Sequence, residues 1–221
     1  MFTLSLLTIF PVRSAPTPTM YVDPEIYNAP GVGRTFTINI TVAEVTDLWG
    51  WTFELFYNST HLNGTDVGEG PFLKTAGETF FYVSNLTDNY NATHGYVRAL
   101  CILTHVIPGP SGTGVIANIT FKTKARGSSV LELTGTKLKK SNGDYITHET
   151  RNGTIVVKVS FDFDDDGDID EDDLWYFCAA FIDYYKIHVK DPLCDFDEDC
   201  DIDEDDLWAF CEAFLDYWKA H

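Results

Sequence analysis

The sequence Asp162-Phe-Asp-Asp-Asp-Gly-Asp-Ile-Asp-Glu-Asp-Asp173 recurs, with two changes, as Asp195-Phe-Asp-Glu-Asp-Cys-Asp-Ile-Asp-Glu-Asp-Asp206. The offset is 33 residues throughout, from position 162 to 195 and from 173 to 206. Each copy has Asp at positions one, three, five, seven, nine and twelve and is followed by an aromatic-rich segment. A solvated acidic tail, kept disordered by its own repulsion, has no reason to repeat this order. The duplication therefore predicts two copies of one folded unit.

This spacing is that of a twelve-residue EF-hand calcium loop, in which every second side chain points inward to give a hard cation six to eight oxygens. Two calcium ions are expected. The predicted ligands are Asp162, Asp164, Asp166, Asp168, Asp170 and Asp173 in the first loop and Asp195, Asp197, Asp199, Asp201, Asp203 and Asp206 in the second. Loop position six favours Gly, which is Gly167 in the first loop, but the second loop has Cys200. A left-handed backbone there costs a non-glycine residue about 1 kcal/mol or more, so either the second ion binds more weakly or a disulfide holds the turn.

After each loop, apolar residues recur at intervals of three and four, which predicts an amphipathic helix. The core stripes are Leu174, Phe177, Cys178, Phe181 and Tyr185 in the first helix and Leu207, Phe210, Cys211, Phe214 and Tyr217 or Trp218 in the second. The apolar residues left for a partner are Trp175, Ile182, Trp208 and Leu215. Two loop–helix calcium segments between Ser160 and His221 resemble the dockerin family, and the resemblance implies binding to a cohesin module.

The net charge of −19 belongs to the C-terminal part alone. From Ser160 onward there are 22 acidic residues and 3 lysines, whereas residues 1–159 hold 12 acidic and 12 basic residues. So acidic a segment is expected to fold only with metal. The overall charge also disfavours nucleic-acid binding. The six histidines are scattered and neither a nucleophile elbow nor a phosphate-binding loop occurs, so no catalytic residue is predicted.

Two features predict an exported protein, extracellular or on the cell surface. The segment 1–19 contains an apolar run, Phe2 to Phe10, that is too short to span a bilayer and resembles a signal peptide, although a truncated gene start or a first strand would also explain it. Seven of the ten asparagines lie in Asn-x-Ser/Thr, which predicts N-linked glycans. They are Asn39, Asn58, Asn63, Asn85, Asn91, Asn118 and Asn152.

Residues 20–159 alternate apolar and polar side chains between turn-rich breaks, which predicts a β-sandwich. The predicted core parity includes Phe36, Ile38, Ile40 and Val42 in one strand and Val115, Ala117, Ile119 and Phe121 in another. Asn39 and Asn118 fall on the polar parity of these strands, so both are expected to face solvent. The expected organisation is a segment 1–19, a sandwich 20–159 and a small calcium-binding helical module 160–221.

The sandwich resembles the cohesin family over nearly its whole length, beginning with Gly33–Val67 and its stretch Trp49-Gly-Trp-Thr-Phe-Glu-Leu-Phe-Tyr57-Asn58. The resemblance implies a jelly-roll type sandwich whose dockerin-binding face uses the strands Gly50–Tyr57, Thr79–Ser84, Tyr96–Leu103 and Val130–Leu138. Strand parity places Trp51, Phe53, Leu55 and Tyr57 inside. The predicted partner-binding residues of the outer face are Phe56, Tyr96, Arg98, Leu100 and Ile102. Asn39, Asn118 and Asn152 are expected on the opposite sheet.

Of the five cysteines, Cys101 has core parity and is expected to be a buried thiol. Cys178, Cys194, Cys200 and Cys211 are disulfide candidates, because four cysteines in about sixty residues of an exported protein favour two bridges. Three pairings are possible, and 178–211 with 194–200 is favoured over the other two.

Three functions follow from this organisation. In the first, the chain assembles head to tail, the sandwich of one copy binding the calcium module of the next. In the second, the calcium module anchors the chain to a separate scaffold while the sandwich binds another dockerin. In the third, the sandwich binds a glycan and the calcium module only anchors the chain. An unrelated sandwich of carbohydrate-binding or adhesion type is the alternative to the cohesin resemblance.

Overall fold

The computed structural model describes residues 16–105, 108–158, 161–164, 169–187, 191 and 193–220. The predicted signal-peptide segment therefore lies almost entirely outside the described residues, as do Asp166, Gly167 and Asp168 of the first loop. Among the described residues no helix is long and apolar enough to cross a membrane.

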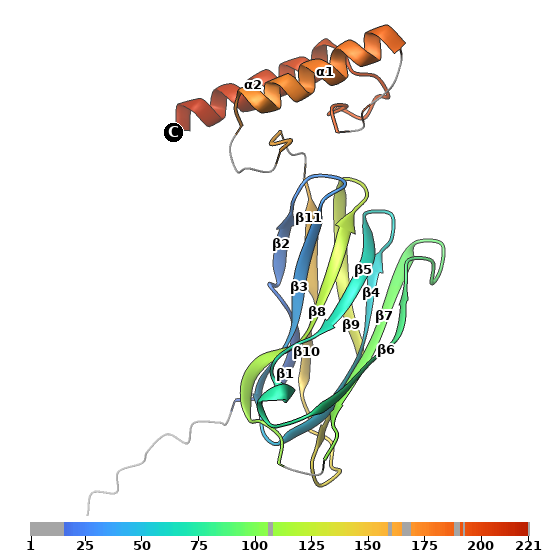
Figure 1. Cartoon of the computed structure of the whole chain (residues 1–221), viewed down its shortest axis with the longest axis vertical. Coiled ribbons are helices and arrows are strands. Elements are labelled where there is room, and N and C mark those ends of the chain that lie inside the picture. The colour runs from blue at the N-terminus through green and yellow to red at the C-terminus, as the bar shows by residue number, and fades with distance from the viewer. Residues whose placement is uncertain are drawn as a thin grey trace, which may run out of the picture.

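The described residues contain eleven strands, which form two sheets. The sheets face each other (Figure 1). The strands are β1 (Thr19–Asp23), β2 (Ile26–Ala29), β3 (Thr35–Val45), β4 (Leu48–Asn58), β5 (Leu62–Glu69), β6 (Thr79–Thr87), β7 (His94–Leu103), β8 (Gly112–Thr123), β9 (Gly127–Lys140), β10 (Glu149–Arg151) and β11 (Gly153–Val157), with a short 3-10 helix η1 (Leu73–Thr75) before β6. The first sheet has the order β10-β1-β3-β8-β5 and the second the order β2-β11-β9-β4-β7-β6. The predicted β-sandwich is confirmed.

The core between the sheets follows the period-two pattern of the strands. All four predicted core residues of β3 are buried, and so are Trp51, Phe53, Leu55 and Tyr57 of β4. The prediction for β8 is wrong at one end: Val115 is only half-buried, whereas Ile116 is buried. The reason is a bulge, because Ile40 pairs with Ala117 and Thr41 with Val115, which leaves Ile116 as the extra residue.

Helices α1 (Glu171–Ile187) and α2 (Glu204–Ala220) form the C-terminal module. They lie side by side across one end of the sandwich (Figure 1), and the Phe177 and Phe210 rings stack between them at 5.4 Å. Both helices carry three acids in the first turn and a lysine in the last, which suits the helix dipole. The outer face of the six-stranded sheet stays clear of the module.

The core stripe of the first helix differs from prediction at its C-terminal end, whereas in the second helix the structure selects Tyr217 from the two predicted residues. Tyr185 and Trp218 are exposed, whereas Tyr184 packs on the core cluster and Tyr217 is half-buried. In a helix with 3.6 residues per turn, the seventh residue after the central Phe177 or Phe210 returns to the same side and the eighth does not. The core stripe therefore ends at Tyr184 and Tyr217.

Candidate functional site

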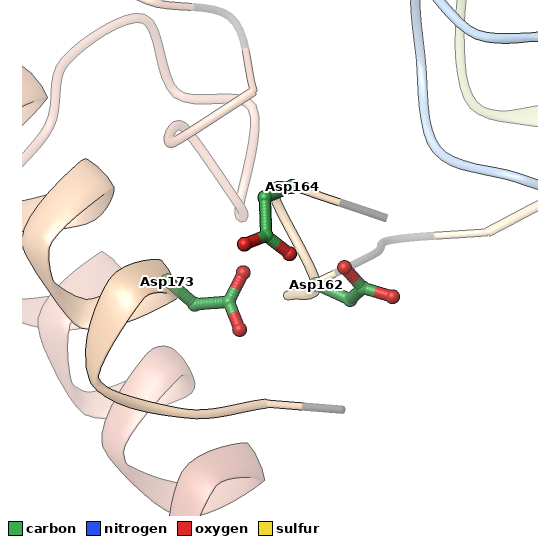
Figure 2. Close-up of side chains that lie close together, drawn as sticks. All are labelled: Asp162, Asp164 and Asp173. Atoms are coloured by element: carbon green, nitrogen blue, oxygen red, sulfur yellow. The ribbon is translucent and has the colours of Figure 1, made fainter. Parts of the chain in front are cut away.

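Three predicted ligands of the first loop come together at the start of α1. Carboxylate oxygens of Asp162, Asp164 and Asp173 all lie within 4.8 Å of one another. Figure 2 shows Asp164 facing Asp173, with Asp162 beside them. Asp170, also a predicted ligand, accepts a hydrogen bond from the Asp172 N–H at 2.8 Å and so caps α1. The other two predicted ligands, Asp166 and Asp168, lie outside the described residues.

The second loop gathers all six of its predicted ligands, in two groups. Asp195, Asp197 and Asp199 form one group with oxygens within 4.8 Å, and Asp201, Asp203 and Asp206 form the other. The hydrogen bonds of the first loop recur here: the Asp203 N–H donates to Asp206 Oδ2 at 3.0 Å, as the Asp170 N–H donates to Asp173 Oδ2 at 2.9 Å. The duplication of the sequence is thus also a duplication of the geometry.

The second loop is electrostatically suited to a cation. Asp206 is only 1% exposed, and burial raises its pKa although the Phe196 and Asp203 N–H groups act to lower it. Burial and then the neighbouring carboxylates of Asp199 and Asp203 raise the pKa of Asp201, whose Oδ1 is buried without a hydrogen-bond partner. Crowded, partly buried carboxylates with an unpartnered oxygen are costly unless a positive charge joins them. The oxygen-only donor set fits a hard divalent cation.

Loop position six of the second copy has the backbone that the sequence pattern requires. Cys200 has φ of +84°, in the left-handed region, and Glu198 has φ of +64°. Both are non-glycine residues in a conformation that favours glycine. The predicted strained turn at Cys200 is confirmed.

The C-terminal module exposes a pair of apolar residues on each helix, outside its small core. Its buried cluster consists of Phe163, Phe177, Cys194, Ile202 and Phe210. Outside it, Trp175 is 73% and Trp208 is 72% exposed, and Ile182 and Leu215 are also exposed. Each pair is related by the 33-residue offset. Trp208 and Leu215 line a hollow of about 350 Å³ along α2. Large exposed tryptophans on a small module indicate a binding surface.

The sandwich carries its own hollow on the outer face of the six-stranded sheet. Leu100 and Ile102 of β7, Trp51 of β4, Tyr145 and the lysines Lys137 and Lys139 line about 200 Å³ of space. Gly50 forms its floor, since a Cβ there would lie 2.8 Å from Ile102 Cγ2 and 3.1 Å from the Cys101 carbonyl oxygen. All four strands expected to build this face, β4, β6, β7 and β9, lie in this sheet. We call this surface the sheet-face hollow.

Of the five residues predicted to be exposed on the outer face, only Arg98 is fully exposed; Phe56, Leu100 and Ile102 are half-buried, and Tyr96 is covered. Tyr96 is 8% exposed, because its ring lies 4.8 Å from Phe56 and 5.0 Å from Tyr90. Arg98 is exposed and pairs with Glu54 at 3.6 Å. The prediction that Tyr96 is exposed is therefore wrong: it belongs to an aromatic cluster at the far end of β7 from the hollow.

Two residues of the face escaped the sequence analysis. Phe80 and Tyr82 of β6 are exposed and stack at 6.4 Å. Strand register places Phe80 beside Ile102 and Tyr82 beside Leu100, so they extend the apolar surface to the sheet edge. In the run Thr79-Phe-Phe-Tyr-Val-Ser84 both parities are apolar, and only the pairing with β7 reveals which side faces out.

Comparison with known proteins decides the family of the sandwich. A family model for the cohesin domain matches residues 27–157, more than half of the chain and nearly all of β2 to β11. The chain belongs to the cohesin family. Cohesins are non-catalytic protein-interaction modules whose partners are dockerins. The chain has no match among curated proteins.

Solved cohesin structures share the fold at low identity. A non-cellulosomal cohesin from Archaeoglobus fulgidus has TM-score 0.52 and 16% identity, covering 64% of this chain and 91% of its own. A type II cohesin from Acetivibrio cellulolyticus has TM-score 0.53 and 19% identity over 66% of this chain and all of its own. The sixth cohesin of scaffoldin B from the same organism, solved with a Cel5 dockerin, has TM-score 0.53 and 16% identity over 65% of this chain and all of its own. At these identities the likeness shows the fold alone.

The seven sequons of the cohesin module differ in how their amides are engaged. Asn39 and Asn118 face each other on the five-stranded sheet, and Asn118 Nδ2 donates to Asn39 Oδ1 at 2.6 Å. Asn63 places its side-chain amide beside the carboxylate of Asp88. Asn58 and Asn91 instead accept N–H bonds from their sequon threonines through Oδ1, both at 2.9 Å. Asn85 is exposed on β6.

The expected place of Asn152 is wrong. It stands between β10 of one sheet and β11 of the other, and its Oδ1 accepts from the Leu133 N–H of β9 at 3.0 Å. It therefore contacts the six-stranded sheet, because the chain crosses between sheets at this residue.

All five cysteines are free thiols, so the predicted 178–211 and 194–200 bridges are absent. Cys178 and Cys211 follow the central Phe177 and Phe210 by one residue, about 100° around each helix, and are half-buried beside the helix contact. Cys194 is buried in the core and Cys200 is exposed on the loop. Cys101 is buried, as expected, and its thiol donates to Glu69 Oε1 at 3.4 Å. Burial raises the Cys101 pKa to about 12.

Proposed function

We propose that the chain is an exported, calcium-dependent adhesion protein that assembles head to tail, the cohesin module of one copy binding the dockerin-like C-terminal module of the next. One observation carries this proposal: the same chain leaves open both the exposed apolar residues of its helices and the sheet-face hollow. Each is the kind of surface that a monomer rarely leaves bare. The exposed tryptophans on one side and the hollow walled by Leu100 and Ile102 on the other are both apolar, and aromatic side chains in apolar pockets are common anchors of interfaces.

Calcium is the proposed metal, because its ligands are oxygens and its coordination tolerates irregular geometry. In the first loop Asp162, Asp164 and Asp173 would hold one ion, and in the second the two groups ending at Asp199 and Asp206 would hold the other. The ion supplies positive charge that lets the carboxylates approach. The chain's own hydrogen bonds, from Asp170 to Asp173 and from Asp203 to Asp206, orient the ligands at position twelve.

Binding between copies, rather than within one, is favoured by the short connection. Strand β11 ends at Val157 and the first loop begins at Asp162, so five residues at about 3.3 Å each reach at most about 17 Å. The module lies across the end of the sandwich and not over the sheet face (Figure 1). Because the two surfaces differ, their contact is heterologous, and such contacts generate a fibre unless the rotation closes a ring.

Charge supports the same pairing. Lys137 and Lys139 border the sheet-face hollow, and the approaching module carries most of the acidic residues of the chain. Opposite charges around an apolar centre favour the correct partner and speed encounter.

The separate-scaffold function remains the second candidate. It is favoured by the solved scaffoldin cohesin, which holds the dockerin of another protein. A glycan-binding sandwich is the third, favoured by the exposed rings of Phe80, Tyr82 and Tyr145 beside the hollow.

Sedimentation velocity of the full chain tests the proposal. In calcium we expect species that grow with protein concentration, and in chelator monomers. Leu100→Asp places a charge in the hollow and should leave a monomer, whereas Ile26→Asp, an exposed aliphatic on β2 away from the hollow, should assemble as the wild type. A wild-type chain that stays monomeric at high concentration in calcium would refute self-assembly. Assembly by Leu100→Asp would refute the proposed face.

A further inference from the structure

Two arginines at the end of the cohesin module touch the two calcium loops at equivalent positions. Arg34, just before β3, donates through Nη2 to the carbonyl of Phe163. Arg126, just before β9, donates through Nη1 to the carbonyl of Phe196 at 2.8 Å. Phe163 and Phe196 are both the second residue of their loop and are 33 positions apart. The sandwich therefore contacts both copies of the duplicated unit in the same way.

Each contacted phenylalanine is held from both sides. The Phe163 N–H donates to Asp173, the position-twelve ligand, while its carbonyl accepts from Arg34. The Phe196 N–H donates to Asp206, while its carbonyl accepts from Arg126. Each arginine therefore binds the carbonyl of the same phenylalanine whose N–H holds the position-twelve carboxylate. An arginine that holds the carbonyl also holds the closed form of the loop.

Further contacts hold both arginines in place at the boundary between the two modules. Arg126 is only 15% exposed, lies 5.9 Å from the Phe196 ring centroid and pairs with Glu198 at 3.6 Å. The Arg34 main chain is fixed to Thr123, whose N–H donates to the Arg34 carbonyl at 2.9 Å. The crevice between the modules has room for about one water molecule, about 20 Å³, and Val32, Phe163 and Leu193 are among its walls. Charge-assisted bonds from a largely buried guanidinium are strong and geometrically specific.

We propose that the end of the cohesin module is a docking site for the calcium loops of its own C-terminal module, where Arg34 and Arg126 each hold one loop closed and calcium thereby fixes the angle between the modules. This rests on the proposed calcium loading but not on head-to-tail assembly. Without the ion the acidic loops repel themselves open and the carbonyls leave the arginines. Because coupling between two binding events is reciprocal, the arginines must strengthen calcium binding by the factor by which calcium strengthens docking.

The test uses the full chain with calcium titrations and with X-ray scattering on the monomer peak of a size-exclusion column. Arg34→Ala with Arg126→Ala should lower the calcium affinity about five-fold or more. In calcium, the double variant should also show a pair-distance distribution within the monomer as broad as that of the wild type in chelator. Arg151→Ala is the control: it removes the same charge from an arginine that lies over the Tyr21 ring, 5.5 Å away, and should change neither result.

The outcomes separate this proposal from the proposed function. A double variant that binds calcium as tightly as the wild type, or scatters like it in calcium, overturns the docking site while leaving calcium loading and assembly intact. A wild type that binds no calcium overturns both. Circular dichroism must show equal helix content for the double variant and the wild type at saturating calcium, since a misfolded module would also scatter broadly; loss of helix there would mean that the arginines support folding rather than docking and would overturn the proposal as well.

Discussion

Two chains that cannot assemble alone should pair when mixed, if head-to-tail binding is correct. One is Leu100→Asp, which has a charge in the sheet-face hollow and keeps the exposed tryptophans. The other is Trp175→Ala with Trp208→Ala, which lacks both exposed tryptophan rings and keeps the hollow intact. A tryptophan side chain offers up to about 250 Å². With 73% and 72% of each exposed, about 180 Å² per ring remains to be buried. Burial of half of it at about 25 cal/mol per Å² contributes about 2 kcal/mol, so the double truncation weakens binding by about 4 kcal/mol, or about a thousand-fold.

The assay is sedimentation velocity in calcium of each variant alone and of an equimolar mixture. Each alone should be a monomer, and the mixture should contain a one-to-one dimer and nothing larger, because only one productive contact is left. Both tryptophans are solvent-exposed, so the truncation should leave the melting temperature unchanged, and Ile26→Ala serves as a control for loss of an exposed apolar side chain outside both surfaces. A mixture that stays monomeric while the wild type assembles would refute the pairing of these two surfaces.

Three further predictions concern folding, pH and the hollow. Phe177→Ala should lower the free energy of unfolding of the C-terminal module by about 3–5 kcal/mol, because it removes a fully buried ring. This loss is comparable to what two calcium ions at a hundred times their Kd contribute, so the variant module should fold only at high calcium. A circular dichroism spectrum equal to that of the wild type at low calcium would contradict this. The raised pKa values of Asp201 and Asp206 add stability below their unfolded pKa that is lost as pH rises through the folded value, so calcium-free helix content should increase from pH 7 to pH 4.5, while calcium affinity falls; helix content that falls on acidification would be the opposite result. Gly50→Ala places a methyl group against the Ile102 side chain and should weaken partner binding about ten-fold in a titration. The β-sheet signal in circular dichroism should not change. An unaltered affinity would show that the partner does not bind at the sheet-face hollow.

Much of the molecule follows from sequence period. Strand alternation identifies the buried side of β4, of β7 except at Tyr96, and of β3 from Phe36 to Val42, because the polar residues of these stretches fall on one parity. It fails where both parities are apolar, as in β6 with Phe80 and Tyr82, and where a bulge changes parity within a strand, as at Ile116. Such features depend on which strand pairs with which, and a single strand does not contain that information.

The ligand pattern was readable for a different reason. A metal loop encodes its geometry locally, so the grouping of Asp195 to Asp206 follows from spacing alone. The absence of disulfides could not be predicted from the sequence, because pairing depends on how the cysteines lie in three dimensions. Cys194 is buried, for example, whereas Cys200 is exposed. The contact of Arg34 and Arg126 with the loops could not be predicted either, because it joins residues 129 and 70 positions apart.

The separation of charge along the chain bears on how such units can join at all. Two calcium ions offset four of the nineteen negative charges, so loaded modules still repel one another. In a head-to-tail fibre, however, successive acidic modules alternate with cohesin modules whose net charge is close to zero. Strand β9 has 14 residues, about 46 Å at ~3.3 Å each, whereas the screening length at physiological ionic strength is about 8 Å. Repulsion between neighbouring modules is then largely screened, and the contact itself, apolar rings against the sheet-face hollow with Lys137 and Lys139 at its rim, decides whether the fibre forms. Two acidic modules brought face to face would gain no such spacing, so under the proposed assembly the arrangement of charge would favour the alternating order over a symmetric dimer.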